Sequence, residues 1–81
     1  MDIVTALNTQ VKPGLSDTFG IAMANMIILQ SSQKAGVSMM GLDNTVYLKL
    51  VNAIASDERV VQLLGRAGAQ TKRDMWSSII K

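Results

Sequence analysis

The sequence contains no cysteine and no histidine, and these two absences remove several classes of function. Without cysteine the chain has neither a disulfide scaffold nor a thiolate nucleophile. Without histidine it lacks the side chain that most often moves protons near neutral pH and most often binds transition metals. The acidic residues are scattered, and none of them forms a general acid/base pair or a metal-ligand spacing. We therefore expect no enzymatic activity, no cofactor and no bound metal.

Charge and long apolar runs are also scarce. Only 17% of the 81 residues are charged, whereas 48% are hydrophobic, so the apolar surface exceeds what one small core readily covers. The longest apolar stretch, residues 20–29, spans ten residues and is interrupted by Asn25, whereas a membrane-spanning helix needs about 20. The N-terminus lacks the basic region of a secretory signal. We expect one domain over residues 1–81, no membrane span, no cleaved signal peptide, and a partner that covers apolar surface.

Proline is almost absent, and the single proline predicts where a first helix ends. Residues 2–12 have a helical spacing of apolar side chains, and Pro13 followed by Gly14 is expected to break or bend that helix. The next helix is predicted over about residues 15–35, because apolar residues recur there at spacings of three and four and Gly36 provides a stop.

The second half of the chain carries another long helical pattern. Residues 37–43 are predicted to form a connector whose last residue, Asp43, can cap the helix that follows. Apolar side chains then follow one stripe over about residues 44–80. Ser56–Glu58 either split this segment by starting a new helix or form the exposed part of one continuous helix, and both alternatives stay open. A continuous helix would be on the order of 55 Å long, too long for so short a chain to cover.

Two helices joined by a connector predict an all-α fold in the form of a helical hairpin. The inward residues of the N-terminal helix are predicted to be Phe19, Ala22, Met26 and Leu29, and their partners Leu50, Ile54, Val61 and Leu64. The N-terminal helix is apolar almost all round, as in a helix surrounded by protein. Further apolar residues are therefore predicted to complete an assembly interface: Ile21, Ile27, Ile28, Met75, Trp76, Ile79 and Ile80. The C-terminal members of this set either meet neighbouring subunits or close the subunit's own core.

Charge is distributed unevenly, which suggests a different function. Residues 1–43 hold two lysines against three aspartates, whereas residues 44–81 hold six basic residues against three acidic ones. Such an excess suits an acidic partner such as nucleic acid, or plain solvation of a helical surface.

A glycine-containing basic segment lies within this half. Residues 63–73 resemble the GXXG loop of KH domains, in which two glycines let a loop between helices approach a nucleic-acid backbone. The resemblance implies nucleic-acid contacts by Gly65, Arg66, Gly68, Lys72 and Arg73. The alternative is a stripe of small residues for close helix packing, at a cost of roughly 1 kcal/mol of helix propensity for each glycine.

The C-terminal residues also resemble the subunits of a known polymer. The sequence KRDMWSSIIK (residues 72–81), with the order of helix, connector and long C-terminal helix, is similar to the needle subunits of type III secretion systems. That resemblance implies subunits packed helically around a lumen and exported without cleavage. Residues 22–31, followed by Gly36 and by residues 44–46, are similar to the small subunits of R-bodies, another protein polymer.

These observations predict a non-enzymatic structural subunit that self-assembles through apolar helix faces into a filament or tube. It would be extracellular if it is needle-like and cytoplasmic otherwise. Its partners would be copies of itself and, in a larger machine, the other subunits of that machine. The alternatives are a small nucleic-acid-binding module, or an accessory or inhibitor subunit, such as a phage protein, whose apolar face has a foreign partner.

Overall fold

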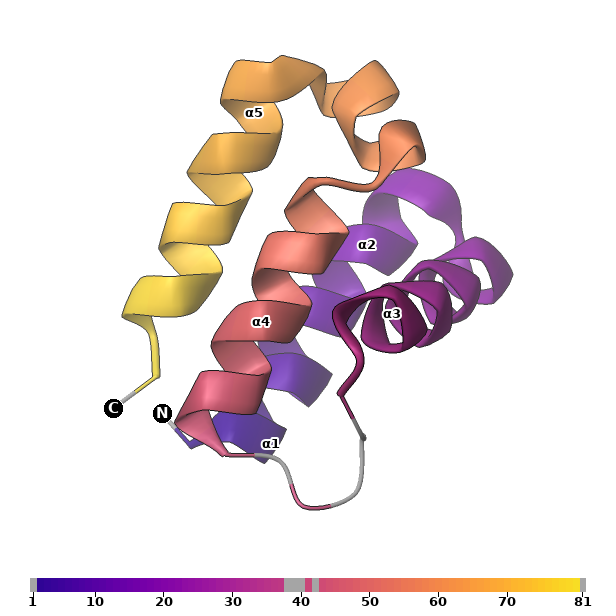
Figure 1. The fold of residues 1–81 in the computed structure, drawn as a ribbon. Coiled ribbons are helices and arrows are strands. Elements are labelled where there is room, and N and C mark those ends of the chain that lie inside the picture. Colours follow the sequence, from indigo (N-terminus) through magenta and orange to yellow (C-terminus); the bar gives the residue numbers. More distant parts are fainter. Residues whose placement is uncertain (1, 38–40, 42, 81) are drawn as a thin grey trace.

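The computed structural model describes residues 2–37, 41 and 43–80, and within these ranges the chain forms helices and no strands (Figure 1). The elements are α1 (Ile3–Ala6), the π-helical turn η1 (Leu7–Val11), α2 (Lys12–Phe19), α3 (Ile21–Ala35), α4 (Asn44–Ala55) and α5 (Glu58–Ser78). The predicted all-α fold is confirmed, and α5 is its long C-terminal helix. Residues 38–40 and 42 of the predicted connector lie outside the described residues.

The first three elements form one helical run that passes through Pro13 and Gly14, so of the break or bend predicted there, the break is wrong. Asp2 caps the run, and its Oδ1 accepts a hydrogen bond from the Thr5 amide at 2.7 Å. Pro13 follows directly after the wider π turn η1, where the hydrogen-bond pattern of the helical run changes. Gly14 leaves room for Trp76, whose Cζ2 would lie 3.4 Å from a Cβ at that position.

Gly20 and Gly65 bend the chain where the sequence pattern predicts uninterrupted helix. Their φ angles are 86° and 76°, with ψ of 159° and 163°, a conformation that is essentially restricted to glycine. Gly20 separates α2 from α3 inside the predicted helix 15–35, and Gly65 divides α5 into residues 58–64 and 66–78. Gly36 ends α3 in the left-handed conformation, as predicted.

The helix also ends between α4 and α5. Of the two alternatives for Ser56–Glu58, the structure therefore confirms the split into two helices. Asp57 caps α5 by accepting a hydrogen bond from the Arg59 amide at 2.8 Å. Asp43 caps α4 in the same way, through the Val46 amide at 2.8 Å, as the sequence predicts. Helix α5 therefore folds back along α4 (Figure 1) instead of continuing it as a rod.

The hydrophobic core draws side chains from all six elements. Its largest fully buried members are Trp76, Tyr47, Leu15, Ile27, Leu50, Ile54, Val11, Val51 and Val60. Trp76 is only 1% exposed and packs within the core of this chain, as the second of the two alternatives for this residue predicts. Ile79 and Ile80 are half-buried against the same core.

Tyr47, the only tyrosine, connects α4 to the end of α5 and can be titrated individually. Its side chain is buried, and its hydroxyl donates a hydrogen bond to the Trp76 carbonyl oxygen at 2.8 Å. Burial raises the pKa of Tyr47 from 10.0 to about 12, because the phenolate would lose its hydration. We expect an ultraviolet titration of the phenolate to have its midpoint near pH 12 in the native protein and near pH 10.0 in denaturant.

The higher pKa of Tyr47 in the native protein makes the free energy of unfolding depend on pH. The unfolded chain loses the Tyr47 proton first, so the contribution to folding is complete below pH 10 and is lost as the pH rises toward 12. Within that window the free energy of unfolding should fall by on the order of 1 kcal/mol per pH unit. The variant Tyr47→Phe should abolish this component of the pH dependence. A native midpoint at pH 10 would contradict the buried position of the hydroxyl.

Candidate functional site

The most exposed apolar surface lies on the outer face of α3. Ile21 is 72% exposed, Leu29 56%, Met26 47% and Met23 37%, and no helix of the described chain covers them. Leu63 of α5 is also 57% exposed. We call these five side chains the α3 patch. Large apolar side chains gathered on one surface of a soluble chain mark an interaction site more often than single exposed ones do.

The predicted inward face of α3 is wrong, because Ala22, Met26 and Leu29 point outward and Phe19 is only half-buried. The buried face is the opposite one, and it consists of Ala24, Ile27, Ile28, Ser31 and Ser32. This face combines the small side chains of Ala24, Ser31 and Ser32 with the two isoleucines, which belong to the hydrophobic core.

The α3 patch continues onto α5 through a shallow hollow of about 310 Å³. Phe19, at the end of α2, and Met23 form one side of the hollow, and Leu63 and Gln62 form the other. Arg59 completes its lining. The hollow therefore joins the exposed side chains of α3 and α5 into one surface.

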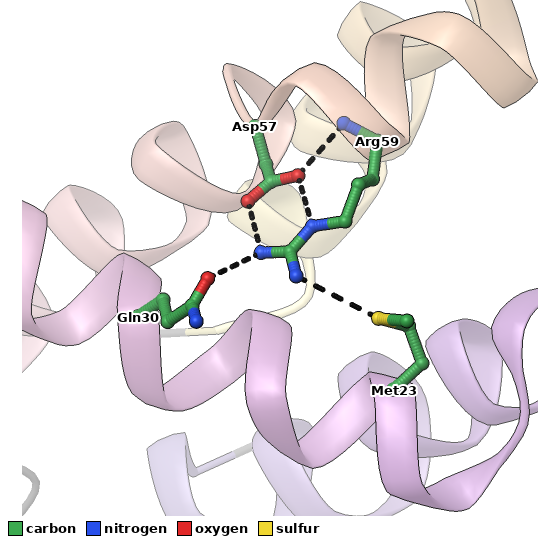
Figure 2. Close-up of polar contacts among 4 residues, drawn as sticks. All are labelled: Met23, Gln30, Asp57 and Arg59. Atoms are coloured by element: carbon green, nitrogen blue, oxygen red, sulfur yellow. Dashed lines mark hydrogen bonds and ion pairs between the residues drawn. The ribbon is translucent and has the colours of Figure 1, made fainter.

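Arg59 fixes the start of α5 against α3 (Figure 2). Its Nε and Nη2 donate hydrogen bonds to the two carboxylate oxygens of Asp57 at 3.0 and 2.8 Å. Nη2 also donates to Gln30 Oε1 at 2.8 Å, and Nη1 to Met23 Sδ at 3.6 Å. The hydrogen bonds from Arg59 hold the pKa of Asp57 below its ordinary value. The guanidinium at the edge of the α3 patch is thus neutralised and held in place.

The structure separates the predicted interface residues into three groups. Buried in the core are Ile27, Ile28, Leu50, Ile54 and Trp76. Half-buried are Phe19, Val61, Leu64, Ile79 and Ile80. Exposed are Ile21, Ala22, Met26, Leu29 and Met75. In this fold the buried group is not accessible to a neighbouring subunit, because its side chains already pack inside the protein.

Met23 and Leu63 are members of the α3 patch that the sequence reasoning missed. Leu63 does carry a recognisable signal, because it is a large apolar residue outside the stripe that contains Val61 and Leu64. Nothing in the sequence distinguishes Met23, because apolar residues lie almost all round α3.

The predicted nucleic-acid residues do not lie together in a loop between two helices, as the KH resemblance implies, because all of them except Gly65 have helical backbone within α5. Gly65 and Arg66 are exposed at the bend of α5, whereas Lys72 and Arg73 are half-buried farther along the helix. Gly68 lies inside the helix, and a Cβ there would come 3.2 Å from Leu64 Cβ. This neighbour belongs to α5 itself, on the other side of the bend at Gly65.

Residues 2–37, 41 and 43–80 contain no group of three or more potential metal-ligating side chains. None of the helices found there has the length and hydropathy needed to cross a membrane. Comparisons with protein-family models, with curated proteins and with solved structures gave no match.

Proposed function

We propose that this protein is a non-enzymatic structural subunit that self-associates through the α3 patch. The observation that carries the proposal is a row of exposed large apolar side chains, Met23, Met26 and Leu29, which recur at spacings of three along α3. Leu63 of α5 continues this row, and Ile21 is exposed at the start of the same helix. Packing a second copy against this face would remove their apolar surface from water, at roughly 25 cal/mol for each Å² buried. The absence of histidine and cysteine supports a role without catalysis.

The charges favour a second copy of the chain over a charged partner. None of the five side chains of the α3 patch is ionisable, and the neighbouring Arg59 is paired with Asp57. Two copies would therefore meet without like-charge repulsion. A partner with a strongly charged surface would instead lose hydration without gaining an ion pair.

The shape of the helix face also suits a two-fold pair. Ala22 and Leu29 lie at equal distances along α3 from the point between Asn25 and Met26. A two-fold axis through that point would place Leu29 over the partner subunit's Ala22, so that a large side chain meets a small one. In such an isologous contact both subunits use the same surface.

A filament would need a second surface that differs from the first. Among the described residues, Val4 of α1 and Leu48 of α4 are further exposed apolar side chains that such a surface would use. The resemblance to type III secretion needles and R-bodies supports extension of the pair into a helical polymer. In the needle form the assembly would be extracellular, and otherwise cytoplasmic.

Disulfide trapping tests the proposed contact, because the chain has no cysteine of its own. The variant Met26→Cys places one thiol near the proposed axis, where two Cα atoms can approach to the roughly 4.4–6.8 Å that a disulfide requires. We expect mild oxidation to give a cross-linked dimer in high yield. Met75→Cys is the matched control, since Met75 is 41% exposed on another helix. Equal yields from the two variants would contradict the proposed contact.

A further inference from the structure

The bend in α5 creates a polar cleft that the proposed assembly does not use. The cleft has a volume of about 450 Å³ and lies between the end of α4 and the two parts of α5. Its polar lining consists of Ser56, Glu58, Gln62, Arg66, Gln70 and Arg73. A volume of this size is in the range of small-molecule sites.

Gly65 brings the two walls of the cleft together. Arg66, Gln70 and Arg73 recur at spacings of four and three, so they line one face of residues 66–78. Gln62 lines the opposite wall from residues 58–64. No atom lies within 4 Å of a Cβ built on Gly65, so its backbone conformation and not its packing explains the glycine.

The two arginines of the cleft are available to a ligand. Within the described chain, the Arg66 side chain makes no hydrogen bond or ion pair. Arg73 contacts only Asp74, through one carboxylate oxygen at 3.1 and 3.3 Å. The Asp74 side chain is 69% exposed, and ion pairs of that kind contribute little. Arg59, by contrast, is fully engaged outside the cleft.

We propose that this cleft binds the phosphate group of a small phosphorylated molecule. The guanidinium groups of Arg66 and Arg73 supply the positive charge and the forked donors that suit phosphate oxygens. The amides of Gln62 and Gln70 supply further donors. Glu58 disfavours a second phosphate and accepts a hydrogen bond from a ligand hydroxyl. This single carboxylate favours a phosphomonoester over the continuous phosphate backbone of a nucleic acid.

Titration of ¹⁵N-labelled protein with glucose 6-phosphate tests the site, with inorganic phosphate and an octanucleotide lacking terminal phosphates as the other two probes. We expect saturable shifts of the Gln62 and Gln70 side-chain amides with glucose 6-phosphate, and weaker binding of inorganic phosphate. Arg66→Gln and Arg73→Gln should each weaken binding by at least about tenfold. Lys49→Gln is the matched control, because it removes the same charge from an exposed position outside the cleft.

Three results would overturn this proposal. The first is the absence of saturable shifts with glucose 6-phosphate. The second is an equal loss of affinity in Lys49→Gln, which would reveal a general effect of net charge. The third is binding of the octanucleotide alone, with strong salt dependence, which would assign the arginines to nucleic acid. Spectra recorded on Met26→Glu protein separate ligand binding from self-association.

Discussion

Replacing Met26 by glutamate is expected to keep the protein monomeric at concentrations at which the unmodified chain is a dimer. Met26 lies at the centre of the α3 patch and is 47% exposed, and glutamate forms helices about as well as methionine. The fold itself should therefore lose little stability. In the pair, two carboxylates would be buried together, and an uncompensated buried charge costs about 3 to 5 kcal/mol. The dimer dissociation constant should rise by at least about 100-fold.

The variant Met75→Glu makes the same chemical change on α5, at a position that is 41% exposed. It should sediment like the unmodified protein. Circular dichroism should give the same helix content for both variants. Equal dissociation of the two variants would point to net charge instead of the α3 patch, and a Met26→Glu protein that still dimerises would exclude the α3 patch.

Replacing Trp76 by alanine is expected to have the largest effect on folding. Trp76 is 1% exposed, packs beside Gly14 of α2, and accepts the Tyr47 hydrogen bond through its carbonyl. Truncation of a buried tryptophan costs about 3 to 5 kcal/mol. A domain of this length has a total stability of only about 4 to 12 kcal/mol. We expect most of the thermal stability to be lost, measured by circular dichroism.

Two further variants separate packing from other contributions of Trp76. Trp76→Phe should lose less stability than the alanine variant, because the indole Nε1 has no hydrogen-bond partner within the described chain. Met75→Ala, at the exposed neighbouring position, should change stability by about 0.5 kcal/mol or less. An alanine variant at Trp76 that unfolds like the unmodified protein would mean that the end of α5 does not close the core.

Helix ends with a local chemical signal could be predicted from the sequence. Asp43 and Gly36 cap their helices as expected, because capping depends on one side chain or one glycine and the adjacent backbone. The bends at Gly20 and Gly65 carry no such signal. A glycine inside an apolar helical pattern is compatible with continuous helix, and only packing between the helices decides whether it adopts positive φ.

The choice of the buried face of α3 could not be made from periodicity. Apolar residues occupy both the face with Met26 and the face with Ile27, so each face satisfies the helical pattern. The fold buries the face that carries Ala24, Ile27 and Ser31. The sequence therefore indicated that apolar surface would be left over, while the location of that surface depended on tertiary packing.

The central claim is that a second copy of the chain covers the α3 patch. Sedimentation equilibrium of the unmodified protein, from about 1 μM to about 1 mM, tests it most directly. The account predicts an average mass that rises with concentration from the 8.7 kDa of the chain to at least twice that value. A mass of 8.7 kDa at every concentration would contradict it.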